Sequence, residues 1–291
     1  MDYESHGNID LHIHTTASDG TYSAGEILDL AQQLGLYAFS ITDHDTIAGV
    51  KEALRIGIPS SIRFLTGVEI SAAPPENFSF SSSFHILGYA IDIDHRELNQ
   101  SLTLLQKARK NRNPRILQKL LELGIPISME EITKEADGGQ MGRPHIAQVM
   151  VKKGIVQSID DAFDQFLGKG KPAYVDKFRI SCQEAVLLIR SAGGIPVLAH
   201  PSLLNIPDDI LEELVVTLKF MGIEGIEVYY PEHSQERIDH YANLARHYDL
   251  LITGGTDFHG ELKPDIRMGS GKGNLRIPHL LYEKIAEKKW K

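Results

Sequence analysis

The sequence has a single cysteine, no long apolar stretch and no excess of positive charge. Cys182 alone excludes a framework of disulfides within the chain and is typical of a reducing compartment. No apolar run approaches the ~20 residues that a membrane-spanning helix needs, and the polar, acidic start of the chain is unlike a signal peptide. A formal net charge of −9 excludes a surface that is basic as a whole. We therefore expect a cytoplasmic protein without membrane contact.

Short runs rich in β-branched residues alternate with helical patterns along most of the 291 residues. Segments such as the one after Ser23 begin with a helix-capping residue and end at a glycine, here Gly35. The alternation predicts parallel βαβ units, and seven strands fit a closed or nearly closed barrel. The expected strands are Ile9–Ile13, Ala38–Thr42, Phe64–Ile70, Phe84–Ile91, Ile195–Ala199, Gly225–Tyr230 and Leu250–Thr253.

One stretch interrupts this alternation. Residues 99–180 contain several helical patterns and no convincing strand, and one helix is expected to begin at Pro114. We therefore expect a barrel formed by residues 1–98 and 181–291. Residues 99–180 are expected to form a helical insertion domain that caps the active site.

Histidine and carboxylate residues gather at the ends of the expected strands. His12 and His14 are two residues apart at the end of the first strand, so both imidazoles project from the same face. In a parallel barrel the strand ends meet at one mouth, where active sites form. Imidazole and carboxylate together suit divalent Zn, Mn or Fe, and the candidates suffice for two or three ions. The other candidates are Asp19, Asp43, His44, Asp45, Glu69, His85, His200, Asp257 and His259.

Each of these residues also has an ordinary structural explanation when it is taken alone. An HxH pattern is common by chance, and Asp19 before Gly20 is typical of a turn. Glu69 alone could be a surface carboxylate and His85 a histidine of the core. The placement of a polar set at nearly every strand end favours a metal site.

Five motifs in this chain resemble the ordered motifs of PHP (polymerase and histidinol phosphatase) domains. They are "DLHIHTTASDGTYS", "ITDHDT", "GVEIS", "AHP" and "GGTDFHG", and they span Asp10 to Gly260. The resemblance implies a distorted (β/α)₇ barrel with a trinuclear metal site. That fold matches the seven strands expected above.

The resemblance also implies a ligand set and a reaction. Two or three ions of Mn²⁺, Fe²⁺ or Zn²⁺ are expected as cofactors, with attack on phosphorus by a hydroxide shared between two of them. Glu69, Asp19 and His200 are assigned to catalysis, and Asp43 is expected to orient an imidazole. By motif, His12, His14, Glu69 and Asp257 hold the first ion, Glu69, His85 and His200 the second, and Asp19, His44 and His259 the third.

The expected insertion suggests the substrate. "GRPH" resembles the PHP subgroup that removes the 3′-phosphate from nucleoside 3′,5′-bisphosphates and that can trim short RNA from its 5′ end. Arg143 is a candidate to grip a phosphate with its planar fork, with His145 beside it. Lys171, in "FLGKGKPAYV", is a second candidate. Both Arg143 and Lys171 could instead be solvated residues of loops.

Further candidates for substrate contact follow the sixth strand. Tyr230 and His233 lie in "EVYYPEHS", where they could contact base or phosphate or only shape the loop. A basic run, Lys107, Arg109, Lys110, Arg112, Arg115 and Lys119, reverses the local charge. The run could steer nucleotides or RNA, or it could be a solvated helix face.

We expect a small phosphorylated partner, a nucleotide, with short RNA as a further candidate and no obligate protein partner. Histidinol phosphate phosphatase activity is an alternative that "GRPH" disfavours. A non-catalytic, metal-stabilised PHP binding module is another, and the complete set of candidate ligands disfavours it.

Overall fold

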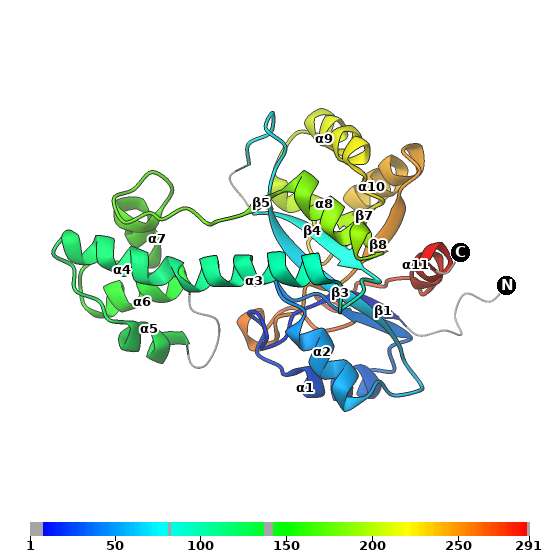
Figure 1. Cartoon of the computed structure of the whole chain (residues 1–291), viewed down its shortest axis with the longest axis horizontal. Helices are drawn as coiled ribbons and strands as arrows, with labels where there is room; N and C mark the ends of the chain where they lie inside the picture. Colours follow the sequence, from blue (N-terminus) through cyan, green and yellow to red (C-terminus); the bar gives the residue numbers. More distant parts are fainter. Residues whose placement is uncertain (1–7, 81–82, 137–141, 290–291) are drawn as a thin grey trace. The chain divides into compact units, whose positions relative to one another are not determined.

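The computed structural model describes residues 8–80, 83–136 and 142–289, and the chain divides into two compact units (Figure 1). The first unit comprises Met1–Leu102 and Arg179–Lys291, and the second comprises Thr103–Phe178. The second unit is shorter at both ends than the expected insertion of residues 99–180. One reason is that helix α3, Arg96–Lys110, begins in the first unit and ends in the second.

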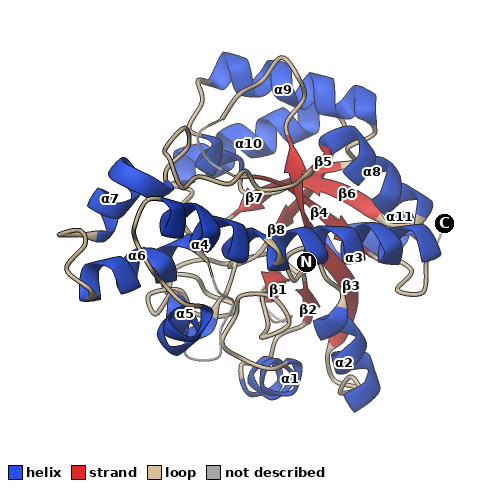
Figure 2. Cartoon of the chain, turned by 60° about the vertical axis from the view of Figure 1, so that its left-hand side comes forward, coloured by secondary structure: helices blue, strands red, loops and turns tan. Residues whose placement is uncertain are grey.

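The first unit is built on one curled sheet with helices around it (Figure 2). The strands pair in the order β1-β2-β3-β4-β6-β7-β8, and β5 pairs with β3 outside this path. Their bounds are β1 Ile9–Ile13, β2 Ala38–Ile41, β3 Arg63–Ala73, β4 Phe84–Tyr89, β5 Ile180–Ser181, β6 Ile195–Leu198, β7 Gly225–Tyr229 and β8 Leu251–Gly254. The seven expected strands are thus confirmed, and the two-residue β5 was not expected.

The direction of β4 differs from the expectation of parallel pairing throughout. β4 runs antiparallel to both of its neighbours, β3 and β6, whereas the other pairs are parallel. His85 is near the start of this strand, and it pairs with Ser71, which is near the end of β3. The reversal therefore brings the beginning of β4 to the edge where the other strands end. This explains how His85 can join residues that follow the parallel strands.

The two ends of the sheet approach each other through the segment after β8. The His14 amide donates to the Phe258 carbonyl at 2.9 Å, and a parallel bridge joins Ile13 to Phe258. Gly255 permits this approach, because a Cβ there would lie 2.2 Å from the Cβ of His12. The sheet is a distorted barrel whose closure lies beside the two histidines of β1.

Helices cover the first unit and follow their capping signals. Ser23 caps α1, as the sequence predicted, and it forms a complete capping box with Glu26. Ser181 caps α8 by accepting from the Glu184 amide. The α-helices are α1 Ala24–Gln33, α2 Ala48–Ile56, α8 Cys182–Ser191, α9 Asp208–Met221, α10 Gln235–His247 and α11 Leu280–Lys289, with short 3₁₀ turns η2 Pro201–Leu204 and η3 Gly260–Leu262.

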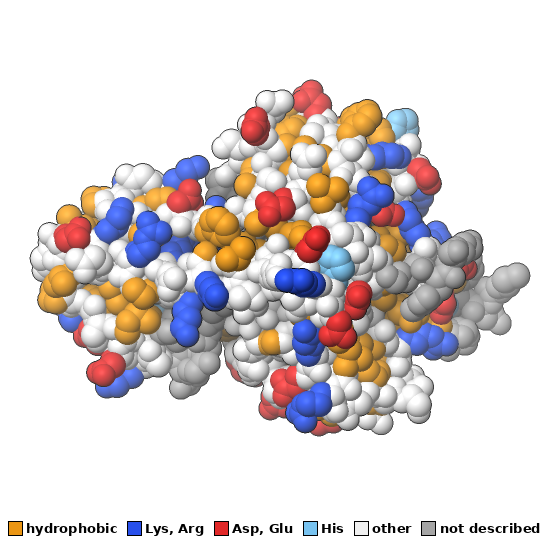
Figure 3. All heavy atoms as spheres, in the orientation of Figure 1, with side chains coloured by type: hydrophobic (Ala, Val, Ile, Leu, Met, Phe, Trp, Pro, Cys, Tyr) orange, Lys and Arg blue, Asp and Glu red, His pale blue; other side chains and the backbone are white. Residues whose placement is uncertain are grey.

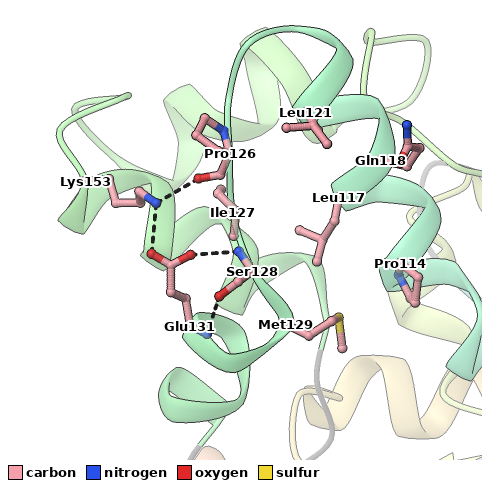
Figure 4. Close-up of a pocket in the computed structure, with 10 residues that line it drawn as sticks. All are labelled: Pro114, Leu117, Gln118, Leu121, Pro126, Ile127, Ser128, Met129, Glu131 and Lys153. Atoms are coloured by element: carbon pink, nitrogen blue, oxygen red, sulfur yellow. Dashed lines mark hydrogen bonds and ion pairs between the residues drawn. The ribbon is translucent and has the colours of Figure 1, made fainter.

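The second unit is helical and has a core of its own, centred on buried residues such as Ile116, Leu120 and Ile146. Its helices are α4 Arg112–Glu122, α5 Met129–Ala136, α6 Arg143–Lys152 and α7 Ile159–Ala162, which continues into the π-helix η1 Phe163–Leu167. A groove of about 510 Å³ lies between α4, the segment before α5, and α5 (Figure 4). None of the helices in the described residues is long and apolar enough to cross a membrane.

Candidate metal centre

The two histidines of β1 face two carboxylates from distant parts of the chain. The side chains of His12 and His14 are fully buried. The Nε2 atoms of His12 and His14 lie 3.5 and 3.3 Å from Oε2 of Glu69. The same two atoms lie 3.4 and 3.1 Å from Oδ1 of Asp257. These four residues form a compact group with the donor types that divalent metals use.

Glu69 lies between two groups of histidines because its two oxygens face different ways. Oε1 lies 2.8 Å from His85 Nδ1 and 3.0 Å from His200 Nε2. Oε2 faces the β1 pair and lies 2.8 Å from His44 Nδ1. The carboxylate is fully buried. A carboxylate divided in this way has the arrangement of a ligand shared by two cations.

A third group lies around Asp19, at the partly exposed side of the cluster. Oδ1 of Asp19 lies 3.5 Å from Nδ1 of His14 and 3.5 Å from Nε2 of His259. Oδ2 lies 3.7 Å from Nε2 of His44. The Asp19 side chain is 28% exposed, the most of these groups, so water and ligands can reach the centre from this side.

Three overlapping sets of side chains in the described residues could each hold an ion. Within each set the ligand atoms lie within 4.8 Å of one another. The sets are His12, His14, Glu69 and Asp257; His14, Asp19, His44 and His259; and His44, Glu69 and His85. The third set has His44 in the place where the sequence analysis expected His200. His200 remains in contact with Glu69 and with His85, whose Nδ1 lies 3.3 Å from its Nε2.

The donor set fits a bound cation because buried polar atoms in it make no hydrogen bond. Such atoms are costly to bury and are nearly always satisfied in folded proteins. They are His12 Nε2, His14 Nε2, Asp19 Oδ1, His44 Nδ1, Glu69 Oε2, His85 Nε2 and His200 Nδ1. Their concentration at one place agrees with the chemistry of a metal centre.

Burial and mutual charge divide the histidines into two kinds. Burial alone would lower the pKa of His14, but the nearby carboxylates of Asp257 and Glu69 raise it to about 10. Burial dominates at His44 and His85 and lowers their pKa values to about 4 and about 3. Burial would raise the pKa of Glu69, but the surrounding histidines hold it well below its usual range. These surroundings favour the ionised form of Glu69, which is the form that binds a divalent cation.

Asp43 was expected to orient an imidazole, and its hydrogen bonds connect it to His14 through Ser18. Its Oδ1 accepts from the Thr15 amide at 2.7 Å and from the Ser18 hydroxyl at 2.6 Å. Its Oδ2 accepts from the Thr15 hydroxyl at 2.8 Å. Ser18 Oγ in turn lies 3.4 Å from Nδ1 of His14. Asp43 thus fixes the loop after β1. It contacts the imidazole through Ser18, because Thr15 and Ser18 of that loop donate hydrogen bonds to both of its carboxylate oxygens.

Two residues contact Asp257 from its other side, and one of them, Lys263, was not expected from the sequence. The Lys263 ammonium lies 2.7 Å from Oδ2 of Asp257, and the Tyr230 hydroxyl donates to the same oxygen at 3.0 Å. The Asp257 backbone is left-handed at φ 53°, a strained conformation for a residue with a side chain. Tyr230 was expected at the mouth, and its buried hydroxyl contacts the candidate ligand itself. No pattern in the sequence marks Lys263.

Two buried carboxylates in the strands were also missed. Asp10 accepts from the amide and hydroxyl of Thr256 and from the Gly269 amide, and burial raises its pKa to about 6. Glu227, in the middle of β7, contacts His12 and the backbone of His200. A signal was present, because an acidic residue inside an apolar strand is buried only when it has partners.

Within the second unit, Arg143 packs against aromatic rings. Its Cζ lies 5.4 Å from the ring centre of Phe163 and 5.5 Å from that of Tyr174. Its Nη1 donates to the Leu167 carbonyl at 2.9 Å. These contacts fix the guanidinium at the first turn of α6 and use part of its donor capacity.

The other substrate candidates differ in exposure. His145 Nδ1 accepts from the Gly142 amide at 3.0 Å and so caps the start of α6. Lys171 is exposed. His233 is buried, and its Nδ1 donates to the Val228 carbonyl at 2.8 Å. Its Nε2 has no hydrogen-bond partner, so this imidazole retains one nitrogen for another contact.

The basic run does not form a single free surface. Arg112 Nε donates to the Val175 carbonyl at 3.0 Å, and Lys119 Nζ donates to the Tyr174 carbonyl at 2.8 Å. Lys107, Lys110 and Arg115 are exposed. On the face drawn in Figure 3, basic and acidic side chains are interspersed. Part of the run therefore has a structural role.

Comparison with known proteins agrees with the geometry. The model of the PHP domain family matches residues 10–167. The chain is 34% identical to a 5′-3′ exoribonuclease of Haemophilus influenzae over 250 residues, 86% of this chain and 89% of the relative. It is 32% identical to a 3′,5′-nucleoside bisphosphate phosphatase of Chromobacterium violaceum over 253 residues, 87% of each chain.

A solved structure shares the fold over nearly the whole chain. It is a crystal structure from Bifidobacterium adolescentis, assigned as a metal-dependent phosphoesterase. The TM-score is 0.75 at 28% identity, and the match covers 98% of this chain and 96% of that one. The likeness therefore includes both the barrel and the helical unit.

Proposed function

Because the chain belongs to the PHP domain family and is a metal-dependent phosphoesterase, we propose that it removes the 3′-phosphate from nucleoside 3′,5′-bisphosphates. Two curated relatives support this substrate class, since their names describe a bisphosphate phosphatase and a 5′-3′ exoribonuclease. Short 5′-phosphorylated RNA is the second substrate class of the proposal. The single cysteine favours a cytoplasmic setting.

The observation that carries the proposal is the position of Glu69 between two groups of histidines. We propose three ions, with Glu69 shared by the first two. The first is held by His12, His14, Glu69 and Asp257, the second by Glu69, His85 and His200, and the third by Asp19, His44 and His259. Mn²⁺, Fe²⁺ and Zn²⁺ all suit these donors. The first and third groups lie within two compact sets of donors, and the contacts of His85 Nδ1 and His200 Nε2 with Oε1 of Glu69 support the second group.

Bound divalent ions would lower the pKa of a coordinated water and neutralise charge on the phosphate. The chain's own residues provide the geometry for this chemistry. Glu69 and Asp257 set the spacing of the donors, and the burial of these two carboxylates limits their contact with bulk water. Lys263 is 42% exposed, so its ammonium borders both Asp257 and solvent. A phosphate that approaches from this side meets a positive charge before it reaches the donors.

Arg143, His145 and Lys171 in the second unit, with Tyr230 and His233 in the first, remain the proposed substrate contacts. Lys171 is exposed and free to contact an anion. Arg143 lies at the start of α6, where backbone amides favour phosphate. The stacking of Arg143 on Phe163 and Tyr174 pre-organises its guanidinium and supports a recognition role. A side chain that is already fixed loses less conformational entropy when it binds a phosphate.

One panel of substrates tests the proposal. Phosphate release is measured from adenosine 3′,5′-bisphosphate, histidinol phosphate and 5′-phosphorylated oligoribonucleotides, with Mn²⁺ added. The proposal expects the highest kcat/KM on the bisphosphate. Faster hydrolysis of histidinol phosphate would replace this substrate class with the alternative. Metal binding without phosphate release from any of the three would favour a binding module.

A further inference from the structure

Glu227 is a carboxylate without solvent contact in the middle of β7, and the proposed ligand set leaves it out. Its Oε1 lies 2.9 Å from Nδ1 of His12. Its Oε2 accepts from the backbone amide of His200 at 2.7 Å. Each oxygen thus serves one partner, and the two partners belong to different proposed metal positions. A buried carboxylate is costly, so both contacts are needed to retain it.

The first contact fixes which nitrogen of His12 can bind a metal. A proton on Nδ1 points to Glu227, so the lone pair available for coordination is on Nε2. That Nε2 makes no hydrogen bond and lies 3.5 Å from Glu69 Oε2 and 3.4 Å from Asp257 Oδ1. The carboxylate also prevents the ring from rotating about its bond to Cβ. A carboxylate behind a ligand imidazole is a known way to orient it and raise its basicity.

The second contact holds a strained piece of backbone. His200 lies two residues after the end of β6 and has φ 25° and ψ 64°, a conformation that residues with side chains rarely adopt. In this conformation its Nε2 lies 3.0 Å from Oε1 of Glu69. Without an acceptor for its amide, the residue would lose a contact that opposes relaxation toward ordinary backbone angles. Glu227 therefore supports the approach of His200 to Glu69.

We propose that Glu227 is a positioning residue that couples the first two metal positions. A single carboxylate orients the His12 ring at one position and the His200 backbone at the other. The inference rests on the proposed metal centre, and it adds that the two positions lose affinity together when Glu227 is changed. A substitution at a residue that orients only one ligand would lower the metal affinity of only one position.

The test replaces the carboxylate by an amide of nearly the same shape. In Glu227→Gln one oxygen can still accept, but the amide nitrogen then faces the second donor. We expect the affinity for Zn²⁺ or Mn²⁺, measured in competition with a chromophoric chelator, to fall about 10- to 100-fold at two sites. Glu232→Gln is the matched control, because Glu232 is exposed in the loop after the same strand. Its metal affinity should equal that of the wild type.

A double-mutant cycle distinguishes positioning from a general structural role. His12→Ala removes the ring through which Glu227 acts at the first position. Glu227→Gln should then cause a smaller additional loss of metal affinity than it causes in the wild type. Equal additional losses in the two backgrounds would overturn the positioning role. If Glu227→Gln does not fold, Glu227→Asp, which keeps the charge but is too short for both contacts, takes its place in the same cycle.

The outcomes separate this inference from the proposed function. If the wild-type protein binds no metal, the proposed metal centre itself is wrong. Wild-type protein that binds metal and hydrolyses the bisphosphate, with a Glu227→Gln variant of unchanged affinity, would overturn only the role of Glu227. A loss confined to one site would overturn the coupling.

Discussion

At the scale of single residues, the two oxygens of Glu69 have different neighbours. Oε2 faces His12, His14 and His44, and Oε1 faces His85 and His200. A buried side chain with five imidazole neighbours is not a surface carboxylate. This excludes the structural explanation that the sequence had left open for Glu69. The charge of this residue, more than its shape, should therefore decide activity.

Glu69→Gln keeps the volume of the side chain and removes its charge. We expect hydrolysis to fall at least about 100-fold, since loss of residues that only support metal ligands already costs 10- to 100-fold. The measurement is turnover at saturating Mn²⁺, with circular dichroism to show that the fold persists. Glu76→Gln, at an exposed position after β3, is the control and should retain full activity. Near wild-type turnover of Glu69→Gln would remove Glu69 from the centre.

Arg143→Ala tests substrate selection. A charge-assisted contact to the phosphate that is not cleaved is worth roughly 1.5–3 kcal/mol. We expect kcat/KM to fall about 10- to 100-fold on the bisphosphate and much less on a small activated phosphoester without a second phosphate. His145→Ala should act in the same direction but more weakly, because a neutral imidazole offers one hydrogen bond.

The structure supplies a specific competing explanation for Arg143. Its contacts with Phe163, Tyr174 and the Leu167 carbonyl could serve only the stability of the helical unit. In that case Arg143→Ala would lower the melting temperature and reduce both activities equally. Arg115→Ala, at an exposed position in the same unit, provides the control for a change of charge alone.

At the scale of elements, the reversed direction of β4 decides how the centre is assembled. A parallel β4 would carry His85 to the edge opposite the other ligands, since the residue is near the start of its strand. Antiparallel pairing with β3 and β6 brings it to the correct edge, 2.8 Å from Glu69. The position of one ligand thus depends on the direction of a whole strand.

Two reciprocal hydrogen bonds between Ser128 and Glu131 stabilise the start of α5. The Ser128 amide donates to Glu131 Oε2 at 2.7 Å, and the Glu131 amide donates to Ser128 Oγ at 3.2 Å (Figure 4). Lys153 Nζ lies 2.8 Å from Glu131 Oε1. The Lys153 ammonium and the Ser128 amide lower the pKa of Glu131 from 4.5 to about 2. The carboxylate therefore stabilises this unit only while it is ionised.

Glu131→Gln should lower the melting temperature at neutral pH. Because the folded pKa is depressed, the stabilisation is fully present above pH 4.5 and is lost as the pH falls through about 2. We expect the difference between wild type and variant to shrink over that range in thermal unfolding curves. Glu130→Gln, at the exposed neighbouring position, should show no such dependence. A difference that stays constant to pH 2 would contradict the role of the ionised carboxylate.

At the scale of the whole molecule, metal binding should be linked to stability. With His200 included, the proposed donors come from seven segments of the folded chain, whereas the unfolded chain has no such site. We expect two to three ions per chain by elemental analysis and loss of activity in chelator. Mn²⁺ at 100 times its dissociation constant should add about 2.7 kcal/mol to the free energy of unfolding per site. One ion or fewer per chain in active protein would contradict the proposal of a multinuclear metal centre.

Local patterns in the sequence were enough to predict the strands and most helix starts. The strand expected at Ala38–Thr42 is observed at Ala38–Ile41, and Ser23 caps α1 as expected. Glu227 and Lys263 could not be predicted in the same way. Glu227 contacts His12, which is 215 positions away, and Lys263 contacts Asp257, which is six positions away across the η3 turn. Such pairs are set by the register of neighbouring strands and the path of loops.

The sequence by itself determined the alternation of strands and helices, the candidate donors at the strand ends and the family. These follow from side-chain periodicity and short motifs, which depend on neighbours within a few residues. Only the tertiary structure decided the direction of β4, the division of Glu69 between two groups of histidines and the hold of Glu227 on His12 and His200. Pairing direction and buried polar contacts depend on segments far apart in the chain, and burial fixes them because an unpaired polar group inside the protein is costly.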